Sequence, residues 1–328
     1  MDFVLLGLLV ITAFVISRST DLLASIMLTG IFSLLSAVFF VLMDAVDVAF
    51  TEAAVGAGIS TILMLATTSL IGQHYERRPT RHIPVYALIV VVVTGSLLVY
   101  GTMDMPVFGN VDTPVQQHVA PRYLNQSGDE IGIPNVVTSV LASYRGFDTF
   151  GETVVIFTAG LGVLTLLGFR RTEHQKNKNV IAAMYPHKIL RVIGSLLIPP
   201  IMLFALYVQF HGDFGPGGGF QAGVIFAVAI ILHSMLFGLA KTRRIFKDRS
   251  IYLAAGAGVL LYGGVGIVSM LKGGDFLDYS VLLSNAVSGQ HIGILLVELG
   301  VGLTVATVML IIYFNFSGRA DHQHEDKT

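Results

Sequence analysis

Acidic side chains within apolar segments are the residues of this sequence best suited to chemistry. An ionisable group at the centre of a membrane helix costs about 2.5–3.5 kcal/mol on insertion scales, so each one is a functional candidate. Carboxylates placed there can bind cations and exchange protons. Six such groups stand out in the apolar segments or in the turns next to them, at Asp47, Glu52, Asp148, Glu152, Asp213 and Glu298.

Glu52 lies about one turn inside its apolar segment. It shares a helical face with Gly56, and small residues surround it at Ala53, Gly56, Ala57 and Ser60. Small residues allow a neighbouring helix to approach closely, so the carboxylate should face protein or water. Thr51 precedes it and is assigned to the same candidate ion path. The alternative is an acid near a helix N-terminus that is stabilised by the helix dipole.

Asp148 and Glu152 are four residues apart, so their like charges share a helical face and repel. Either one is protonated, or a cation or Arg145 neutralises them. A helix cap with an Arg145–Asp148 pair explains the same residues equally well. Glu298 lies about two turns into the last apolar segment, where a buried functional role or a contact with another subunit is expected.

The most distinctive motif is a glycine-rich segment that includes Asp213. Its signature residues are His211, Gly212, Asp213, Gly215, Pro216, Gly217, Gly218, Gly219, Phe220 and Gln221. The string from Gly217 to Ala222 matches G-x-G-x-x-A, but no strand precedes it and no acidic residue follows at the required distance, which excludes nucleotide binding. Dense glycine permits close backbone approach and positive φ. A tight hairpin that seals a subunit contact and an ion-handling role both remain open.

The composition is that of a membrane protein. Of 328 residues, 54% are hydrophobic and 12% are charged, against about 25% charged in soluble domains. Apolar runs of about 20 residues predict an all-α polytopic fold with about nine transmembrane helices. The runs are 3–17, 22–43, 48–71, 83–100, 149–169, 189–210, 218–240, 251–271 and 291–316. The first is short, but it lacks the basic start and cleavage site of a signal peptide, so a retained helix is expected.

Charge and cysteine content narrow the function further. The chain has no cysteine, which excludes disulfides, iron–sulfur clusters and thiolate metal sites. The net charge of −1 gives no excess of positive charge of the kind that binds nucleic acid. The connections between the predicted helices lie alternately on the two sides of the membrane. Of the 20 basic residues, only Arg122, Arg145 and Lys272 lie in the connections on one side. The positive-inside rule therefore predicts an outside N-terminus and an inside C-terminus, with the candidate carboxylates in the outer half.

Three strings resemble known antiporter segments. The strings from Asp47 to Gly56 and from Gly151 to Phe157 resemble the D-like and E-like segments of membrane-bound hydrogenase (MbhD and MbhE). In many Mrp antiporters these segments form the C-terminal part of the large A subunit, and the first is related to the J subunit of complex I. The string from His211 to Gly223 is similar to the hallmark of the Mrp/Mnh B subunit. The chain departs from a separate B subunit because the D/E-like part is fused in front.

With this resemblance, four regions are expected. They are a D-like block (1–100), a polar outer connection (101–148), an E-like helix with a basic inner loop (149–187) and a B-like four-helix domain with a short tail (188–328). The resemblance implies Asp47 and Glu52 as the leading ion-path residues, followed by Glu152. It implies no redox cofactor and no metal site, and it carries the glycine-rich loop over only as a signature.

The resemblance also implies a function and partners. The chain is expected to be a non-enzymatic component of a multi-subunit Na⁺/H⁺ antiporter in the cell membrane of a bacterium or archaeon. The expected partners are the A, C and D proteins of the Mrp complex and its smaller subunits, with Na⁺, H⁺ and the lipid bilayer. Two alternatives remain: a purely structural membrane subunit, and the equivalent component of a hydrogenase or complex-I-like enzyme.

Overall fold

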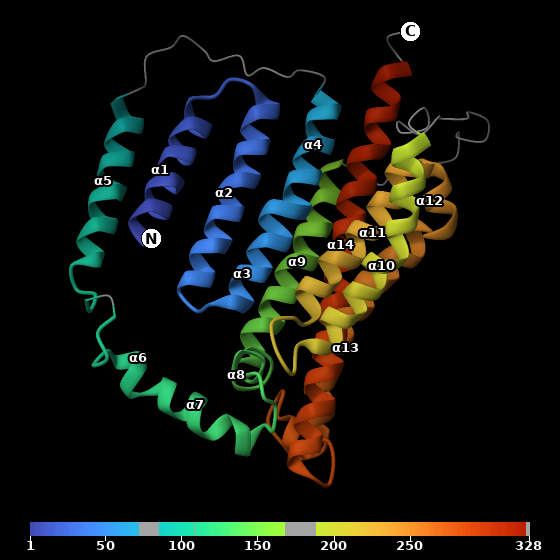
Figure 1. Ribbon diagram of the computed structural model, residues 1–328. Coiled ribbons are helices and arrows are strands. Elements are labelled where there is room, and N and C mark those ends of the chain that lie inside the picture. The colour runs from blue at the N-terminus through green and yellow to red at the C-terminus, as the bar shows by residue number, and fades with distance from the viewer. Residues whose placement is uncertain (72–84, 108, 168–187, 326–328) are drawn as a thin grey trace.

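The computed structural model describes residues 1–71, 85–107, 109–167 and 188–325, and it is helical throughout most of this part, without a strand (Figure 1). Eight described helices are long and apolar enough to cross a membrane. They are α2 (Leu22–Leu42), the continuous segment Val46–Thr68, α5 (Val85–Thr102), α9 (Gly146–Leu167), α10 (Lys188–His211), α11 (Gly219–Phe237), α13 (Asp248–Leu271) and the apolar part Ala286–Gly318 of α14 (Ala286–Glu325). The predicted all-α polytopic membrane fold is confirmed.

The first predicted span is the helix α1 (Asp2–Arg18). Its 17 residues extend about 25 Å, against a hydrocarbon core of about 30 Å. A helix of this length matches the core only with some thinning of the bilayer or with its ends in the headgroup region. The crossing of α1, and with it the ninth span, therefore stays a prediction.

The third span contains a π-helical segment that the apolar pattern did not reveal. It consists of α3 (Val46–Glu52), the π-helix η1 (Ala53–Ile59) and α4 (Ser60–Ile71). The π-helix is rare, and single π turns inside α-helices are frequently found at functional sites. Gly56 lies in η1 against α2, where a Cβ atom would be 2.8 Å from Cβ of Ser33. The small-residue face therefore does bring a neighbouring helix close.

The outer connection, predicted as polar and turn-rich, is largely helical. It contains α6 (Pro114–Gln117), α7 (Val119–Glu130), α8 (Val136–Thr138) and the π-helix η2 (Ser139–Tyr144). The segment α6–α7 runs across the lower end of the helices in Figure 1. Short polar helices form here because Thr113 and Asn135 cap α6 and α8 with their side chains.

The helix α14 is the centre of the C-terminal part. It packs against α9, α11 and α13 through glycines: a Cβ atom at Gly160 would lie 3.0 Å from Val308, and one at Gly258 would lie 2.6 Å from the carbonyl oxygen of Gly300. Contacts this close between helix backbones need small residues. The turn between α11 and α13 carries α12 (Leu239–Ile245), and the loop between α13 and α14 carries the 3-10 helix η3 (Tyr279–Val281).

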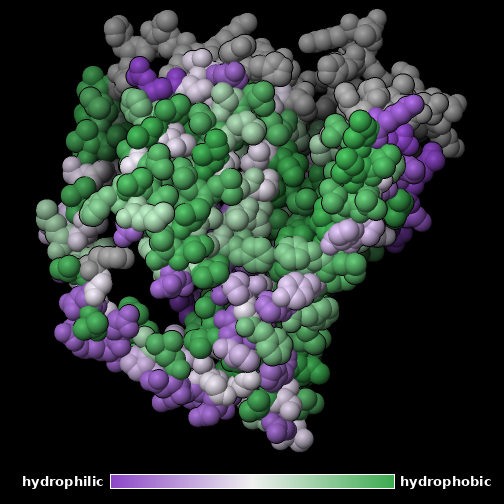
Figure 2. Space-filling view, viewed as in Figure 1, coloured by the Kyte–Doolittle hydropathy of each residue, from purple (hydrophilic) through white to green (hydrophobic). Residues whose placement is uncertain are grey.

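Hydrophobic residues cover the middle of the face shown in Figure 2, and hydrophilic residues gather toward its lower end. The connections 43–45 and 212–218 lie toward that end, and the C-terminus lies at the opposite end (Figure 1). Much of the predicted basic side, including Arg77, Arg78, Arg81 and 170–187, lies outside the described residues. The sidedness of the chain in a membrane stays a prediction.

Candidate functional site

The glycine-rich loop connects α10 to α11. Gly218 has φ 111° and stands directly before the first residue of α11. Its backbone N–H donates to the carbonyl of Val208, 3.0 Å away, which folds the loop back onto α10. A residue with a side chain adopts this φ only with strain, so the positive φ expected of the motif is found at this position.

The loop is pressed against α14 and α10 of the same chain. A Cβ atom at Gly218 would lie 3.0 Å from Oε1 of Glu298, and one at Gly217 would lie 2.7 Å from the carbonyl oxygen of Val208. Gly219 packs on the backbone of Glu298. The close approach expected of the glycines is therefore made within the chain, and it brings the loop to the carboxylate of Glu298.

A segment that the sequence analysis did not single out clamps the loop. The side-chain amide of Asn135 donates to the carbonyls of Gly212 (3.1 Å) and Gly215 (3.0 Å), and the hydroxyl of Thr138 donates to the carbonyl of Gly212 (2.6 Å). These bonds join α8 to the loop over more than 70 residues of sequence. The sequence carried only a weak signal, namely that Asn135 follows Pro134 in a turn-rich stretch.

Three of the predicted ion-path carboxylates gather around this loop. Asp47, at the start of α3, lies near the backbone N–H of Gly217 and the side-chain amide of Asn135. Glu298 is close enough to Asp47 and Asp213 to be acted on electrostatically by both. We call Asp47, Asp213 and Glu298 the carboxylate cluster. Its members come from the N-terminal helices, the loop and α14.

Asp213 has a basic neighbour that the sequence analysis missed. Nδ1 of His291 lies 3.7 Å from its carboxylate, and Nε2 of the same ring lies 3.2 Å from the carbonyl oxygen of Gly132. Burial raises the pKa of Asp213, and the charge of a protonated His291 opposes that shift. The spacing held a signal, because His291 precedes Glu298 by seven residues, two helical turns along one face of α14.

Thr51 also reaches the site, whereas Glu52 faces a different neighbour. The amide Nε2 of Gln221 donates to the Thr51 hydroxyl at 2.7 Å, and that hydroxyl donates to the backbone carbonyl of Asp47 at 3.0 Å. The carboxylate of Glu52 lies against Gly56 of its own helix, where Ser33 of α2 also packs. Glu52 is half-buried, and its carboxylate lies near Gly56 and Ser33.

Asp148 and Glu152 lie on α9, apart from the cluster. The guanidinium of Arg145 pairs with Asp148 at 2.6 Å, and both side chains are more than half exposed. This is the capping pair that one of the two interpretations proposed. Glu152 is exposed, and it acts electrostatically on the hydroxyl of Tyr262, as Glu298 also does.

The chemistry that this site offers is that of oxygen ligands with negative charge. Carboxylates, loop carbonyls and a hydroxyl suit hard cations. Within the described ranges no three His, Asp or Glu side chains are arranged to hold a metal ion. His233, by contrast, is a packing group of α11, with Nδ1 2.8 Å from the Thr242 hydroxyl.

Sequence comparisons identify the C-terminal part. Residues 189–311 match the family described as "Domain related to MnhB subunit of Na+/H+ antiporter". The putative antiporter protein mnhB2 of Staphylococcus aureus (strain Newman) is 32% identical over 134 residues, which cover 40% of this chain and 94% of that protein. The chain belongs to the MnhB family of antiporter subunits.

Ahead of this part, the MnhB-family chain carries two further matches, to the family of the MBH D subunit at 7–73 and to that of the MBH E subunit at 85–182. The A/B subunit of a probable K⁺/H⁺ antiporter from Rhizobium meliloti (strain 1021) is 27% identical over 327 residues, covering 88% of this chain. The chain spans 32% of the length of that relative. The four-region division predicted from the sequence stays a prediction.

Two solved structures resemble the MnhB-family chain. The Mrp complex from Dietzia sp. DQ12-45-1b contains a chain with a TM-score of 0.74 at 22% identity, which covers 96% of this chain and 34% of that one. A chain of the archaeal membrane-bound sulfane sulfur reductase has a TM-score of 0.53 at 28% identity, covering 70% of this chain and 96% of that one. The fold is therefore shared with a chain of the Mrp complex and with a chain of an archaeal respiratory membrane complex.

Proposed function

We propose that the chain is a non-catalytic component of a multi-subunit monovalent cation/proton antiporter in the cell membrane, with the A, C and D proteins of an Mrp-type complex and its smaller subunits as partners. In this proposal the carboxylate cluster of Asp47, Asp213 and Glu298 is a binding site at which a cation and protons replace each other. The observation that carries it is the convergence of three acids from distant parts of the sequence on one glycine-rich loop.

The cluster is suited to exchange because its charges interact. Carboxylates that share a site disfavour each other's ionised forms, so a proton or a cation that neutralises one eases ionisation of the others. Loss of a proton from the cluster therefore strengthens its attraction for a cation, and cation binding favours proton release. The antiporter function is supported by the matching family, which is named for a Na⁺/H⁺ antiporter, and by a relative named as a probable K⁺/H⁺ antiporter subunit.

The D- and E-like matches favour one second candidate, a component of a respiratory ion-pumping complex. In such an enzyme the same cluster would work beside redox partners contributed by other chains. Purification of the complex distinguishes the two candidates. Antiporter subunits without redox proteins support the first, whereas co-purifying redox subunits support the second.

The experiment for the cluster removes one ionisable group at a time. Asp47→Asn and Glu298→Gln keep the shape of the side chain and remove its charge. Asp44→Asn is the matched control, because Asp44 lies three residues from Asp47, is exposed, and has a φ of 57° that asparagine tolerates. We expect both cluster variants to lose most Na⁺/H⁺ exchange in everted vesicles, at least tenfold, while Asp44→Asn exchanges normally.

Assembly has to be measured together with transport. Co-purification of the other subunits at wild-type levels shows that the variants are intact. Glu52→Gln belongs in the same series, because the family resemblance assigns it to the ion path although it faces α2. Wild-type exchange by assembled Asp47→Asn and Glu298→Gln complexes would refute the exchange role and leave a structural one.

A further inference from the structure

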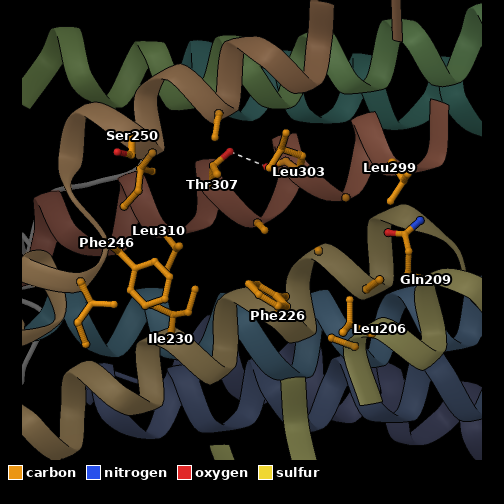
Figure 3. A pocket seen from close by; sticks show the side chains of 18 residues that line it. Leu206, Gln209, Phe226, Ile230, Phe246, Ser250, Leu299, Leu303, Thr307 and Leu310 are labelled. Carbon is orange, nitrogen blue, oxygen red and sulfur yellow. Dashed lines mark hydrogen bonds between the residues drawn. The ribbon is translucent and has the colours of Figure 1, made fainter. Parts of the chain in front are cut away.

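An apolar cavity of about 390 Å³ lies between the four long helices of the MnhB-type part (Figure 3). Its walls come from α10, α11, α13 and α14, and it is hollow because its lining includes the small residues Ala222, Gly223, Ala254, Gly302 and Ala306. Gln209 and Leu299 lie at one end, and Phe246 and Ser250 lie at the other (Figure 3). The carboxylate cluster does not use this space.

The size of the cavity fits a hydrocarbon chain. An apolar cavity of about 150 Å³ holds one benzene molecule, so by proportion 390 Å³ holds about 16 carbon atoms. Its lining on α14 runs from Leu299 to Leu310, about 16 Å along the helix and so about half of the 30 Å hydrocarbon core. A transmembrane helix about 10 Å wide and 30 Å long occupies roughly 2,400 Å³, which is far too large.

Basic residues are neighbours in sequence of Ile245, Phe246 and Ser250, which line one end of the cavity. Arg244, Lys247 and Arg249 lie at or just after the end of α12 and are exposed, and no ion pair involving them is found in the part of the chain that the structure describes. Arg243 is engaged differently: it donates to the carbonyl of Phe314 at 2.7 Å and lies 3.6 Å from Asp248. Basic pockets between membrane helices on the cytoplasmic side bind anionic lipid head groups.

We propose that this cavity is a binding site for an anionic phospholipid. One acyl chain fills the cavity from the Ser250 end, and the phosphate lies at Arg244 and Lys247. Gln209, packed against Gly302, closes the opposite end and keeps the chain away from Glu298. The proposal combines the volume of a single chain with positive charge at one mouth, and it does not depend on antiport activity.

The first test fills the cavity. Ala254→Phe places a ring in the space, and Ala257→Phe is the matched control because Ala257 lies three residues along α13 and is exposed. The full chain is purified with its co-purifying subunits, equilibrated with dioleoylphosphatidylglycerol, and its retained lipid is counted by native mass spectrometry. We expect Ala254→Phe to lower retained lipid at least fivefold and Ala257→Phe to match the wild type. Equal retention by all three proteins overturns the proposal.

The second test addresses the head group and leaves the packed helices untouched, so it still applies if Ala254→Phe fails to assemble. Arg244→Gln combined with Lys247→Gln should lower the preference for phosphatidylglycerol over phosphatidylcholine by about fivefold per residue. Arg18→Gln, at the end of α1, is the control. A wild-type protein that retains both lipids equally overturns the anionic assignment.

A third measurement separates lipid from a helix of another protein in the complex. The chain has no cysteine, so Ala254→Cys carries its single thiol. In the assembled complex this thiol should be modified by a lipid-soluble maleimide and protected by added phosphatidylglycerol. Efficient cross-linking of the thiol to a neighbouring protein would show that a protein covers the cavity, and would overturn the proposal.

Discussion

The side-chain amide of Gln221 donates a hydrogen bond of 2.7 Å to the hydroxyl of Thr51, across 170 residues of sequence. This bond joins the first turn of α11, directly after the glycine-rich loop, to the helix that begins with Val46 and Asp47. Gln221 is 7% exposed, so the bond lies in the protein interior. It connects the D-like part of the chain to the MnhB-type part at the carboxylate cluster.

Removal of one partner of this hydrogen bond should weaken the contact between the D-like part and the MnhB-type part. Thr51→Val leaves the buried amide of Gln221 without its acceptor, which typically costs about 1–3 kcal/mol. Thr51→Ser keeps the hydroxyl and is the control. We expect Thr51→Val to lower the thermal stability of the purified complex and to weaken cation-dependent exchange. If Thr51→Val and Thr51→Ser behave alike, the bond contributes nothing to the junction.

Gly218 should not tolerate a side chain. Its φ of 111° is strained for any other residue, and a Cβ atom would lie 3.0 Å from Oε1 of Glu298. Backbone strain of this kind costs about 1–3 kcal/mol. Gly218→Ala should therefore reduce the amount of assembled complex, whereas Gly256→Ala, with no atom within 4 Å of the added methyl group, should assemble normally. Normal assembly of Gly218→Ala would contradict the close packing of the loop on α14.

The apparent Na⁺ affinity of the antiporter should fall as the pH becomes more acidic. Burial raises the pKa of Asp213, and His291 opposes that shift. A proton therefore displaces a cation from Asp213 as the pH falls through this raised pKa. His291→Gln removes the opposing charge, so the pKa rises further and the acid-side loss moves to higher pH.

The measurement is the apparent Na⁺ affinity of everted vesicles as a function of pH. His118→Gln is the control, because His118 is exposed in the outer connection. Asp213→Asn should remove this part of the pH dependence altogether. A His291→Gln profile that overlays the wild type would show that Asp213 does not titrate in the exchange.

The helices were predictable because apolar runs of membrane length have few other structures open to them. The π-helix at Ala53–Ile59 was not, since an α- and a π-helical turn differ by one residue and leave the same apolar pattern. The helix α7 was hidden for another reason. Gly128 and Pro121 stand within it and resemble turn residues, yet the Arg122–Glu130 pair at 3.3 Å spans most of its length.

Tyr144 should anchor α7 until strongly alkaline pH. Its hydroxyl donates to the carboxylate of Glu130, and burial together with this bond raises the pKa of Tyr144 from 10.0 to about 12. The stabilisation is complete below pH 10.0 and is lost as the pH rises through about 12. Tyr144→Phe should accelerate hydrogen exchange in α7 several-fold, and Tyr123→Phe, which keeps the ring contact at 5.0 Å, should not.

The orientation of the chain can be tested with single cysteines, since the chain has none of its own. We expect a membrane-impermeant maleimide to modify Asn125→Cys from outside, and Lys247→Cys only after permeabilisation. Phe3→Cys reports on α1, and it should be modified from outside if α1 crosses the membrane. Modification of Asn125→Cys and Lys247→Cys from the same side would refute the predicted topology.

The candidate residues were predictable one by one, but their grouping was not. Asp47 and Glu298 were predicted as single acids in or next to apolar segments, and Asp213 was predicted as part of the glycine-rich motif. That these three meet, and that Asp148 instead pairs with Arg145, depends on how distant helices pack. Asn135 was missed because an amide in a polar loop looks like any turn residue until the loop it clamps lies next to it.

The 40-residue helix α14 is about 60 Å long, twice the thickness of the hydrocarbon core of about 30 Å. His291 and Glu298 lie toward one end of α14. Phe314, whose carbonyl oxygen accepts a hydrogen bond from Arg243, lies toward the other end. Because α14 is one continuous helix of this length, a tilt of about 5° displaces one of its ends relative to the other by about 5 Å. A change of charge at the carboxylate cluster that tilts α14 would therefore move the opposite side of the protein without any relay of side chains between them.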